Sequence, residues 1–119
     1  NNKEVLVYNG EIYNFKNLKK NFKKKIKFST TGDTEVLFES LSKNGYSKTL
    51  NLIEGMFSFV YINKRKNKII FARDRFGQKP LFYHFDKNNL IICSEIKPIL
   101  EVLKKKITLD KELIKALLI

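Results

Sequence analysis

The stretch GMFSFVYINKRKNKIIFARD, residues 55 to 74, contains the clearest β pattern of the sequence. Its two runs of β-branched and aromatic residues, 56–62 and 68–73, flank a polar segment, which predicts two strands joined by a turn. The stretch PLFYHFDKNNLIICSE, residues 80 to 95, repeats this pattern with the expected turn at 86–89. We therefore expect two antiparallel β-hairpins.

Two shorter segments before residue 55 also favour strands. KEVLVY, residues 3 to 8, is an apolar run that suits a buried strand, and KIKFS, residues 25 to 29, alternates between polar and apolar side chains. The first of these runs leads directly into Asn9 and Gly10, a pair that ordinarily forms a tight turn. We therefore expect the first strand to stop near this pair.

Helical patterns occupy most of the remaining sequence. One helix is expected after Asn14, and a clearer one lies in TTGDTEVLFESLSKNG, residues 30 to 45, with Thr31 or Asp33 as its cap and Gly45 as its end. The residues expected to face inward from these two helices are Phe15, Leu18, Phe22, Val36, Leu37 and Leu41. Further helices are expected at 47–53, at 95–105 with Pro98 in the first turn, and from Leu109 or Asp110 onward. Strands in hairpins with helices grouped elsewhere predict an α+β fold with a mostly antiparallel sheet.

Composition narrows the class of protein. A chain of 119 residues that is 43% hydrophobic is expected to form one globular domain with a true core. No apolar run reaches the length of a membrane span, so no membrane partner is expected. The single cysteine, Cys93, excludes a disulfide framework and a multi-cysteine metal site, and it fits a reducing compartment. We expect no metal site in this chain.

The net charge of +12 raises the alternative of a nucleic-acid-binding module. Of the 24 basic residues, however, all but Arg65, Arg73 and Arg75 are lysines, whereas arginine is the usual reader of bases and phosphates. The lysines cluster at 18–27, 63–68 and 103–107, at expected helix ends and a hairpin tip. This distribution favours solvated faces, so nucleic-acid binding remains the less favoured alternative.

His84 and Cys93 are the only residues of their kinds, and a catalytic dyad between them must be considered. If Phe85 pairs with Leu90 across the second hairpin, Phe82 pairs with Cys93. His84 and Cys93 would then be diagonal neighbours, roughly 7–8 Å apart by backbone. That separation is too long for a nucleophile–base hydrogen bond, so we interpret them as a buried thiol and a half-exposed histidine.

The segment ARDRFGQKPLFY, residues 72 to 83, joins the two expected hairpins. We interpret it as a turn with a salt-bridged base, in which Asp74 stays ionised between Arg73 and Arg75. Gly77 and Pro80 would set its backbone angles.

The segment LVYNGEIYNF, residues 6 to 15, contains the most plausible chemical site. If it faces a cleft, the Asn9 side-chain amide and the Gly10 N–H are two donors that form an oxyanion hole for acyl transfer. Glu11 and Asp33 would then bind the cationic amine of an amino acid. The alternative for Asn9 and Gly10 is a simple turn, and the alternative for Asp33 is a helix cap.

Five segments in order closely resemble the glutamine-hydrolysing asparagine synthetases, whose amidotransferase domain is of class II. They are VYNGEIYNF, TTGDTEVLF, EGMFSFVY, ARDRFGQKPLFY and CSEIKPIL, and the similarity covers nearly the whole chain. The resemblance implies an N-terminal nucleophile hydrolase fold, a four-layer α/β/β/α sandwich that is incomplete at the N-terminus in this chain. It implies residues 1–105 as a partial glutaminase domain and 106–119 as the start of a connection to a missing synthetase domain.

The resemblance also implies roles for individual residues. Asn9 and Gly10 match the side-chain and backbone donors of the oxyanion hole, Glu11 matches a glutamine-binding residue, and Asp33 matches the carboxylate that receives the α-amino group. The cysteine nucleophile and the arginine that binds the glutamine carboxylate have no match in this chain. The fragment alone is therefore expected to be inactive.

The expected substrate is glutamine, whose ammonia would amidate aspartate in the missing synthetase domain of the same chain. ATP and Mg²⁺ are expected in that domain and no cofactor in this one. The resemblance further implies a cytoplasmic protein and leaves a homodimer open. Tyr8 stands before the Asn-Gly pair where sister amidotransferases usually have histidine, yet an enzyme that amidates a different acceptor remains an alternative.

Overall fold

The computed structural model describes residues 3–22 and 26–104. The chain divides into two compact units, residues 1–81 and residues 82–119. Both units combine helices with antiparallel strands, which confirms the predicted α+β class.

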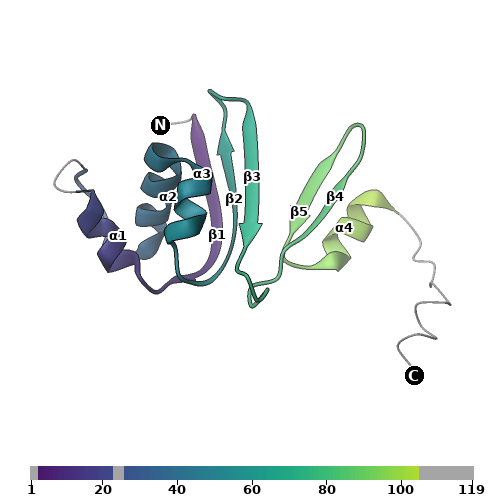
Figure 1. Cartoon of the computed structure of the whole chain (residues 1–119). Coiled ribbons are helices and arrows are strands. Elements are labelled where there is room, and N and C mark those ends of the chain that lie inside the picture. Colours follow the sequence, from purple (N-terminus) through teal and green to yellow (C-terminus); the bar gives the residue numbers. More distant parts are fainter. Residues whose placement is uncertain (1–2, 23–25, 105–119) are drawn as a thin grey trace, which may run out of the picture. The chain divides into compact units, whose positions relative to one another are not determined.

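The first unit is built on a three-stranded antiparallel sheet with the order β1-β2-β3 (Figure 1). Its strands are β1 (Glu4–Ile12), β2 (Gly55–Asn63) and β3 (Lys68–Arg73). The β2–β3 hairpin confirms the pattern in residues 55–74. β1 differs from the prediction because it continues through the Asn-Gly pair to Ile12, paired with β2 along its whole length.

Three helices cover one face of this sheet: α1 (Phe15–Asn21), α2 (Asp33–Asn44) and α3 (Tyr46–Leu52) (Figure 1). Gly45 ends α2, as predicted, but neither Thr31 nor Asp33 caps it. Gly32 occupies the cap position and Asp33 is the first helical residue. Asn14 occupies the cap position of α1, but its side chain donates to the Leu52 carbonyl and accepts from the Glu54 N–H, so it makes no capping hydrogen bond.

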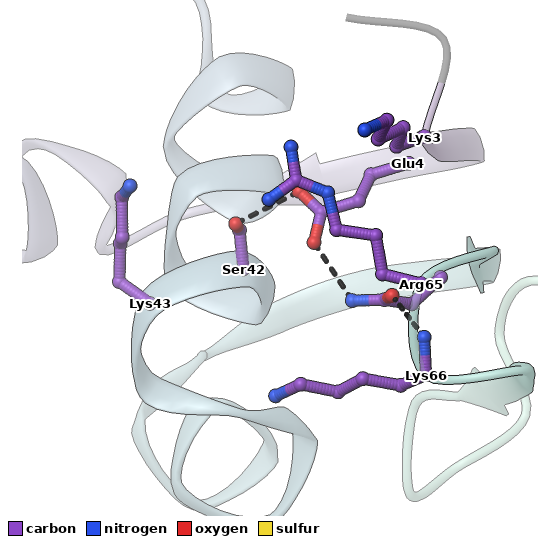
Figure 2. A pocket seen from close by; sticks show the side chains of 7 residues that line it. Lys3, Glu4, Ser42, Lys43, Arg65 and Lys66 are labelled. Carbon is purple, nitrogen blue, oxygen red and sulfur yellow. Dashed lines mark hydrogen bonds between the residues drawn. The ribbon is translucent and has the colours of Figure 1, made fainter.

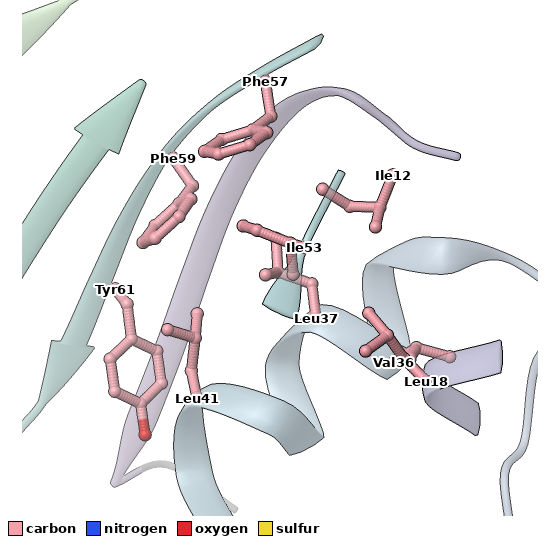
Figure 3. Close-up of a cluster of buried hydrophobic side chains, with 9 residues drawn as sticks. All are labelled: Ile12, Leu18, Val36, Leu37, Leu41, Ile53, Phe57, Phe59 and Tyr61. Atoms are coloured by element: carbon pink, nitrogen blue, oxygen red, sulfur yellow. The ribbon is translucent and has the colours of Figure 1, made fainter. Parts of the chain in front are cut away.

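The core of the first unit lies between the sheet and the helices (Figure 3). Phe59 of β2 and Val36 and Leu37 of α2 are at most 1% exposed, and Leu41 follows one turn later. Burying each such side chain contributes about 1.5–3 kcal/mol, so the i, i+4 stripe of α2 fixes this helix on the sheet. The full set of buried residues is Ile12, Leu18, Val36, Leu37, Leu41, Ile53, Phe57, Phe59 and Tyr61.

The opposite face of the sheet is also apolar but lies open. Alternation along the strands places Val5 and Val7 on this face, together with Ile69 of β3. These side chains are 39%, 62% and 50% exposed, respectively. A sheet that is apolar on both faces is typical of an internal layer.

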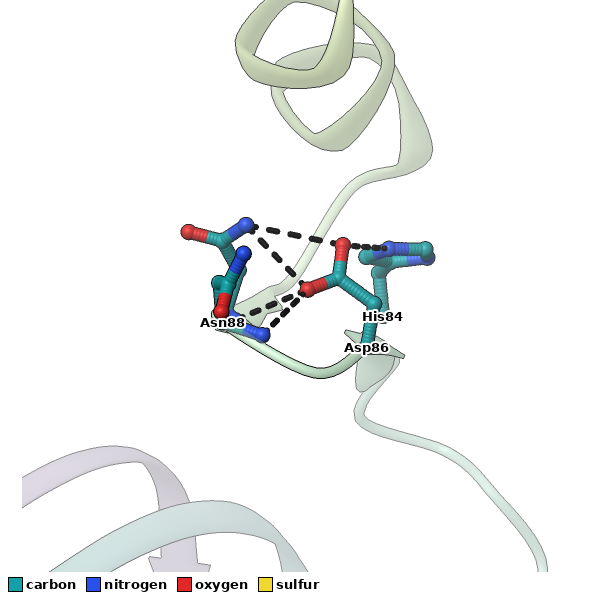
Figure 4. A network of polar contacts seen from close by, with 4 residues as sticks. His84, Asp86 and Asn88 are labelled. Atoms are coloured by element: carbon teal, nitrogen blue, oxygen red, sulfur yellow. Dashed lines mark hydrogen bonds and ion pairs between the residues drawn. The ribbon is translucent and has the colours of Figure 1, made fainter.

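The second unit is a hairpin with one helix packed against it. β4 (Phe82–Phe85) pairs with β5 (Leu90–Cys93), and α4 (Ile96–Leu103) follows. The register pairs Phe85 with Leu90, as predicted. The turn is organised by Asp86, whose carboxylate accepts from the backbone N–H groups of Asn88 and Asn89 and contacts the His84 ring (Figure 4).

The strand predicted in KIKFS is absent from its described residues, 26–29. The Phe28 ring packs edge-on against Phe22, with ring centroids 5.8 Å apart. The next backbone N–H groups, of Ser29 and Thr30, donate to the Glu35 carboxylate instead of a neighbouring strand. The helix predicted from Leu109 or Asp110 and the segment 106–119 lie outside the described residues.

Candidate active site

Gly10 lies inside β1, opposite Phe57, and not in a turn. Its φ is +146°, and a Cβ added there would lie 2.2 Å from the Met56 carbonyl oxygen. No side chain fits that space, so glycine is required by the close approach of the two strands. The prediction of a turn was wrong because the local Asn-Gly preference is overridden by strand pairing along residues 4–12.

The hydrogen-bond alternation of the sheet turns the Gly10 N–H away from β2. Just past the strand, the Tyr13 N–H donates to the Glu54 carbonyl at 2.7 Å, so odd-numbered residues of β1 exchange hydrogen bonds with β2. The N–H groups of even-numbered residues, including Gly10, therefore point to the outer edge of β1. Ile12 follows this rule, because its N–H donates to Asp33 Oδ2 at 2.8 Å.

Asp33 reaches this same edge from the start of α2. Its Oδ2 also accepts from the Tyr8 hydroxyl at 2.6 Å, so two donors of β1 hold one carboxylate oxygen. Within the described part of the chain, Oδ1 accepts no hydrogen bond from the protein. Asp33 is half-buried and lies in the first turn of α2.

The surroundings of Tyr8 disfavour ionisation of its hydroxyl. Burial, and then the hydrogen bond to Asp33 with its negative charge, raise the pKa of the Tyr8 hydroxyl far above its usual range. Glu11 adds a smaller contribution of the same sign. The hydroxyl therefore stays a neutral donor to Asp33 near neutral pH.

Glu35 fixes the segment that enters α2. Its carboxylate accepts from the N–H groups of Ser29 and Thr30 and from the Thr30 hydroxyl at 2.6–2.9 Å. These donors, the Ser29 N–H first, lower the pKa of the Glu35 carboxyl. A glutamate in the first turn that reaches back in this way sets the start of the helix, and thereby the position of Asp33.

Asn9 and Glu11 point to a different side of β1 from Asp33. Both side chains are exposed on the open face of the sheet, where Asn9 lies opposite Ser58 and Glu11 opposite Met56. The structure thus places Asp33 and the Gly10 N–H at the outer edge, and Asn9 and Glu11 on the adjoining face. Asn9, Gly10 and Glu11 are consecutive in β1, and Asp33 contacts this strand one residue later, at the Ile12 N–H.

Comparison with known proteins decides the family. The sequence model of the glutamine amidotransferase domain matches residues 1–119, the whole chain. The chain belongs to the glutamine amidotransferase domain family. This domain is homologous to the glutaminase part of asparagine synthetases, which confirms the resemblance.

Three relatives illustrate the similarity. A putative glutamine-hydrolysing asparagine synthetase of Methanocaldococcus jannaschii is 39% identical over 110 residues, covering 91% of this chain and 21% of the relative. One from Bacillus subtilis is 46% identical over 93 residues, covering 78% of this chain and 12% of the relative. One from Gallus gallus is 36% identical, covering 82% and 17%, respectively. This amidotransferase domain thus spans about a fifth or less of the length of these relatives.

The turn after β3 in this amidotransferase domain is held by Asp74. The Asp74 carboxylate is 5% exposed and accepts from the backbone N–H groups of Phe57, Phe76, Gln78 and Lys79 at 2.9–3.2 Å. Burial raises the pKa of this carboxyl, but the four donors outweigh burial and hold the pKa below its usual value. The predicted salt bridge was wrong: among the described residues, neither flanking arginine forms an ion pair with Asp74. The turn also presents Phe76, which is 90% exposed.

A basic hollow lies at the other end of β1, where the strand begins (Figure 2). Glu4 lies at its centre and accepts from Ser42 Oγ at 2.9 Å and from Asn63 Nδ2 at 2.7 Å. The surrounding cations are Lys3, Lys43, Arg65 and Lys66. The hydrogen bonds of Glu4 tie β1 to α2 and β2, so this cluster stabilises the end of the sheet remote from Gly10.

His84 and Cys93 do not form a dyad. The Phe82–Cys93 pairing is the predicted one, and the His84 Nε2 lies 3.0 Å from Asp86 Oδ2 (Figure 4).

In residues 3–22 and 26–104, no group of three or more histidine, cysteine or acidic side chains could hold a metal ion. None of the helices in the described ranges is long and apolar enough to cross a membrane.

Tyr8 and Ile12 are the site residues that sequence analysis missed. Their signal was the alternation in β1, since positions 8, 10 and 12 share one edge only if the strand continues through Gly10. The predicted turn concealed this alternation. The roles of Asn9, Gly10, Glu11 and Asp33 remain predictions.

Proposed function

We propose that this chain is the glutaminase part of a glutamine-hydrolysing asparagine synthetase. The observation that carries the proposal is the meeting of an anionic carboxylate, Asp33, and an outward-directed backbone donor, the Gly10 N–H, at one strand edge. Cleavage of the amide needs donors for the oxyanion, and recognition of glutamine as an amino acid needs an acceptor for its ammonium group. Family membership supports glutamine as the substrate.

Asp33 would bind the α-ammonium group through Oδ1, the oxygen that accepts no hydrogen bond from residues 3–22 and 26–104. The carboxylate–ammonium contact is a charge-assisted hydrogen bond, stronger than a neutral one. Glu11, on the adjoining face of β1, would contribute a second negative charge to the recognition of glutamine.

The amide carbonyl would lie at the rim where the outer edge of β1 meets its open face. There its oxygen can accept from the Gly10 N–H at the edge and from the Asn9 side chain on the face. Both donors strengthen their hydrogen bonds as negative charge develops on the oxygen, so they lower the barrier and not merely the free energy of binding.

The attacking group would be the thiol of a cysteine at the mature amino terminus of the full-length protein, with its own α-amino group as base. Attack on the amide carbon gives a tetrahedral oxyanion, and protonation of the amide nitrogen releases ammonia and leaves a thioester. Water then hydrolyses the thioester to glutamate and restores the thiol. This chain would supply the oxyanion donors and the ammonium acceptor for both steps.

The complete domain would be the four-layer sandwich of N-terminal nucleophile hydrolases. The open apolar face bearing Val5, Val7 and Ile69 supports this, because a second sheet would bury it. The chain covers only a small fraction of the length of its relatives, which supports a synthetase domain separate from this one. We expect that domain to use ATP and Mg²⁺ to amidate aspartate, in a cytoplasmic enzyme.

The test is product formation by the full-length protein. Purified enzyme with aspartate, ATP and Mg²⁺ is expected to form asparagine from either glutamine or ammonia. Alkylation of thiols should abolish the glutamine-dependent reaction and spare the ammonia-dependent one. Absence of glutamine hydrolysis in folded, unmodified enzyme would contradict the proposal.

A further inference from the structure

We propose that Tyr8 is a positioning residue that fixes the Asp33 carboxylate for the ammonium group of the substrate. This inference rests on the proposed function, because it takes Asp33 as the ammonium acceptor. It goes further because the Tyr8 hydroxyl is given the task of orienting that carboxylate. The same hydroxyl would thereby contribute to the preference for substrates that carry an α-amino group.

The geometry divides the two oxygens of Asp33 between two tasks. The Tyr8 hydroxyl and the Ile12 N–H both donate to Oδ2, at 2.6 and 2.8 Å, from positions on either side of Gly10. Two donors on one oxygen fix the rotation of the carboxylate about its Cβ–Cγ bond. Within the described residues, Oδ1 then remains free to accept a hydrogen bond from the substrate.

The chemistry of tyrosine suits this task. Its hydroxyl is neutral, so it orients Asp33 without cancelling the negative charge that an ammonium group needs, as a lysine would. Burial, and then the hydrogen bond to Asp33, raise the pKa of the hydroxyl, so it remains a neutral donor near neutral pH. The ring packs against the core beside Leu6, which limits its motion. An acceptor that is fixed before binding loses less entropy when the substrate arrives.

Removing only the hydroxyl tests this role, because Tyr8→Phe keeps the ring and its packing. In full-length enzyme, KM for glutamine should rise about 5- to 10-fold, the equivalent of one hydrogen bond, with kcat nearly unchanged. The second substrate is 4-carbamoylbutanoate, which is glutamine without its α-amino group. Tyr8→Phe should leave kcat/KM for this substrate unchanged, because no ammonium group meets Asp33.

Two further variants make the result specific. Tyr46→Phe removes a hydroxyl from a tyrosine of α3 that is 48% exposed, and it should alter neither substrate. In an Asp33→Asn background, Tyr8→Phe should add little to the loss already present, since both changes act on one interaction.

The outcomes separate the two proposals. If wild-type enzyme hydrolyses glutamine but Tyr8→Phe lowers kcat/KM equally for both substrates, the hydroxyl is only structural and this inference is overturned. Unchanged KM for glutamine in Tyr8→Phe overturns it as well. If folded wild-type enzyme hydrolyses neither substrate, the proposed function itself fails.

Discussion

Gly10 and Met56 approach so closely that a Cβ on Gly10 would lie 2.2 Å from the Met56 carbonyl oxygen. Gly55 faces the same crowding from the other strand, because its Cβ would lie 2.0 Å from the Glu11 carbonyl oxygen. The two glycines therefore lie where the paired strands β1 and β2 approach each other too closely for a side chain. The outer edge of β1 contacts Asp33 beside this point.

Gly10→Ala should therefore destabilise the domain strongly. A non-glycine residue at an unfavourable φ costs about 1–3 kcal/mol, and the clash with backbone atoms adds to this. The measurement is the free energy of unfolding from urea titrations of the full-length protein. The matched control is Gly32→Ala, because a Cβ at Gly32 meets nothing within 4 Å and its φ is −81°. A similar loss of unfolding free energy in both variants would show that β1 and β2 leave room for a side chain at Gly10.

Asp33→Asn should raise KM for glutamine in the full-length enzyme. The amide oxygen can still accept from Ile12, but the charge that attracts the ammonium group is lost. A hydrogen bond to a charged group contributes roughly 1.5–3 kcal/mol, equivalent to about 10- to 150-fold in KM. Steady-state kinetics provide the measurement, with Glu39→Gln on the same helix as control. A KM near the wild-type value in folded Asp33→Asn would limit Asp33 to a structural role.

The hairpins were predictable because their signals are local and agree with one another. In residues 55–74 the β-branched runs and the polar turn all favour the observed β2–β3 pairing. KIKFS failed because alternation alone does not provide a partner strand. There Glu35 accepts the backbone N–H groups of Ser29 and Thr30, an interaction that no local pattern predicts.

The roles of the candidate site residues stay predictions, and the geometry of that segment could not be predicted from the sequence. Family resemblance selected Asn9, Gly10, Glu11 and Asp33, whereas the turn propensity of Asn-Gly wrongly ended β1. Strand pairing with β2, contributed by residues far along the chain, reverses that local preference. The contact between Tyr8 and Asp33 spans 25 positions, which is beyond the range of any periodicity.

Asp74→Asn should destabilise the domain in a pH-dependent manner. The pKa of Asp74 is lowered in the folded state, so its ionised form stabilises the domain above the unfolded pKa of about 3.8, and this stabilisation is lost as pH falls through the folded value. The difference in unfolding free energy between wild type and variant should thus be largest near neutral pH and shrink below pH 4. Urea titrations at several pH values measure it, with Glu101→Gln as control. If the difference in unfolding free energy grew as the pH falls, the ionised Asp74 carboxylate would not be the form that the backbone donors stabilise.

Asn9→Ala should lower kcat with glutamine if the Asn9 side chain, on the open face of β1, has a catalytic role and not only a structural one. Loss of one oxyanion donor costs on the order of 10²–10³ in kcat, because the donor acts mainly as charge develops. KM for glutamine should change less, since Asp33 and Glu11 remain. Synthesis from added ammonia should proceed at the wild-type rate, because that chemistry is expected in a separate domain.

Val7→Ala is the matched control for Asn9→Ala, since Val7 is on the same face of the same strand and is 62% exposed. It should leave kcat with glutamine close to the wild-type value. The measurements are glutamine-dependent and ammonia-dependent product formation, with the melting temperature recorded for each variant. If Asn9→Ala lowers both activities and the melting temperature together, the side chain stabilises the sheet and donates nothing to the oxyanion. If it lowers only the glutamine-dependent kcat, the rim of β1 beside Gly10 is where the amide is cleaved.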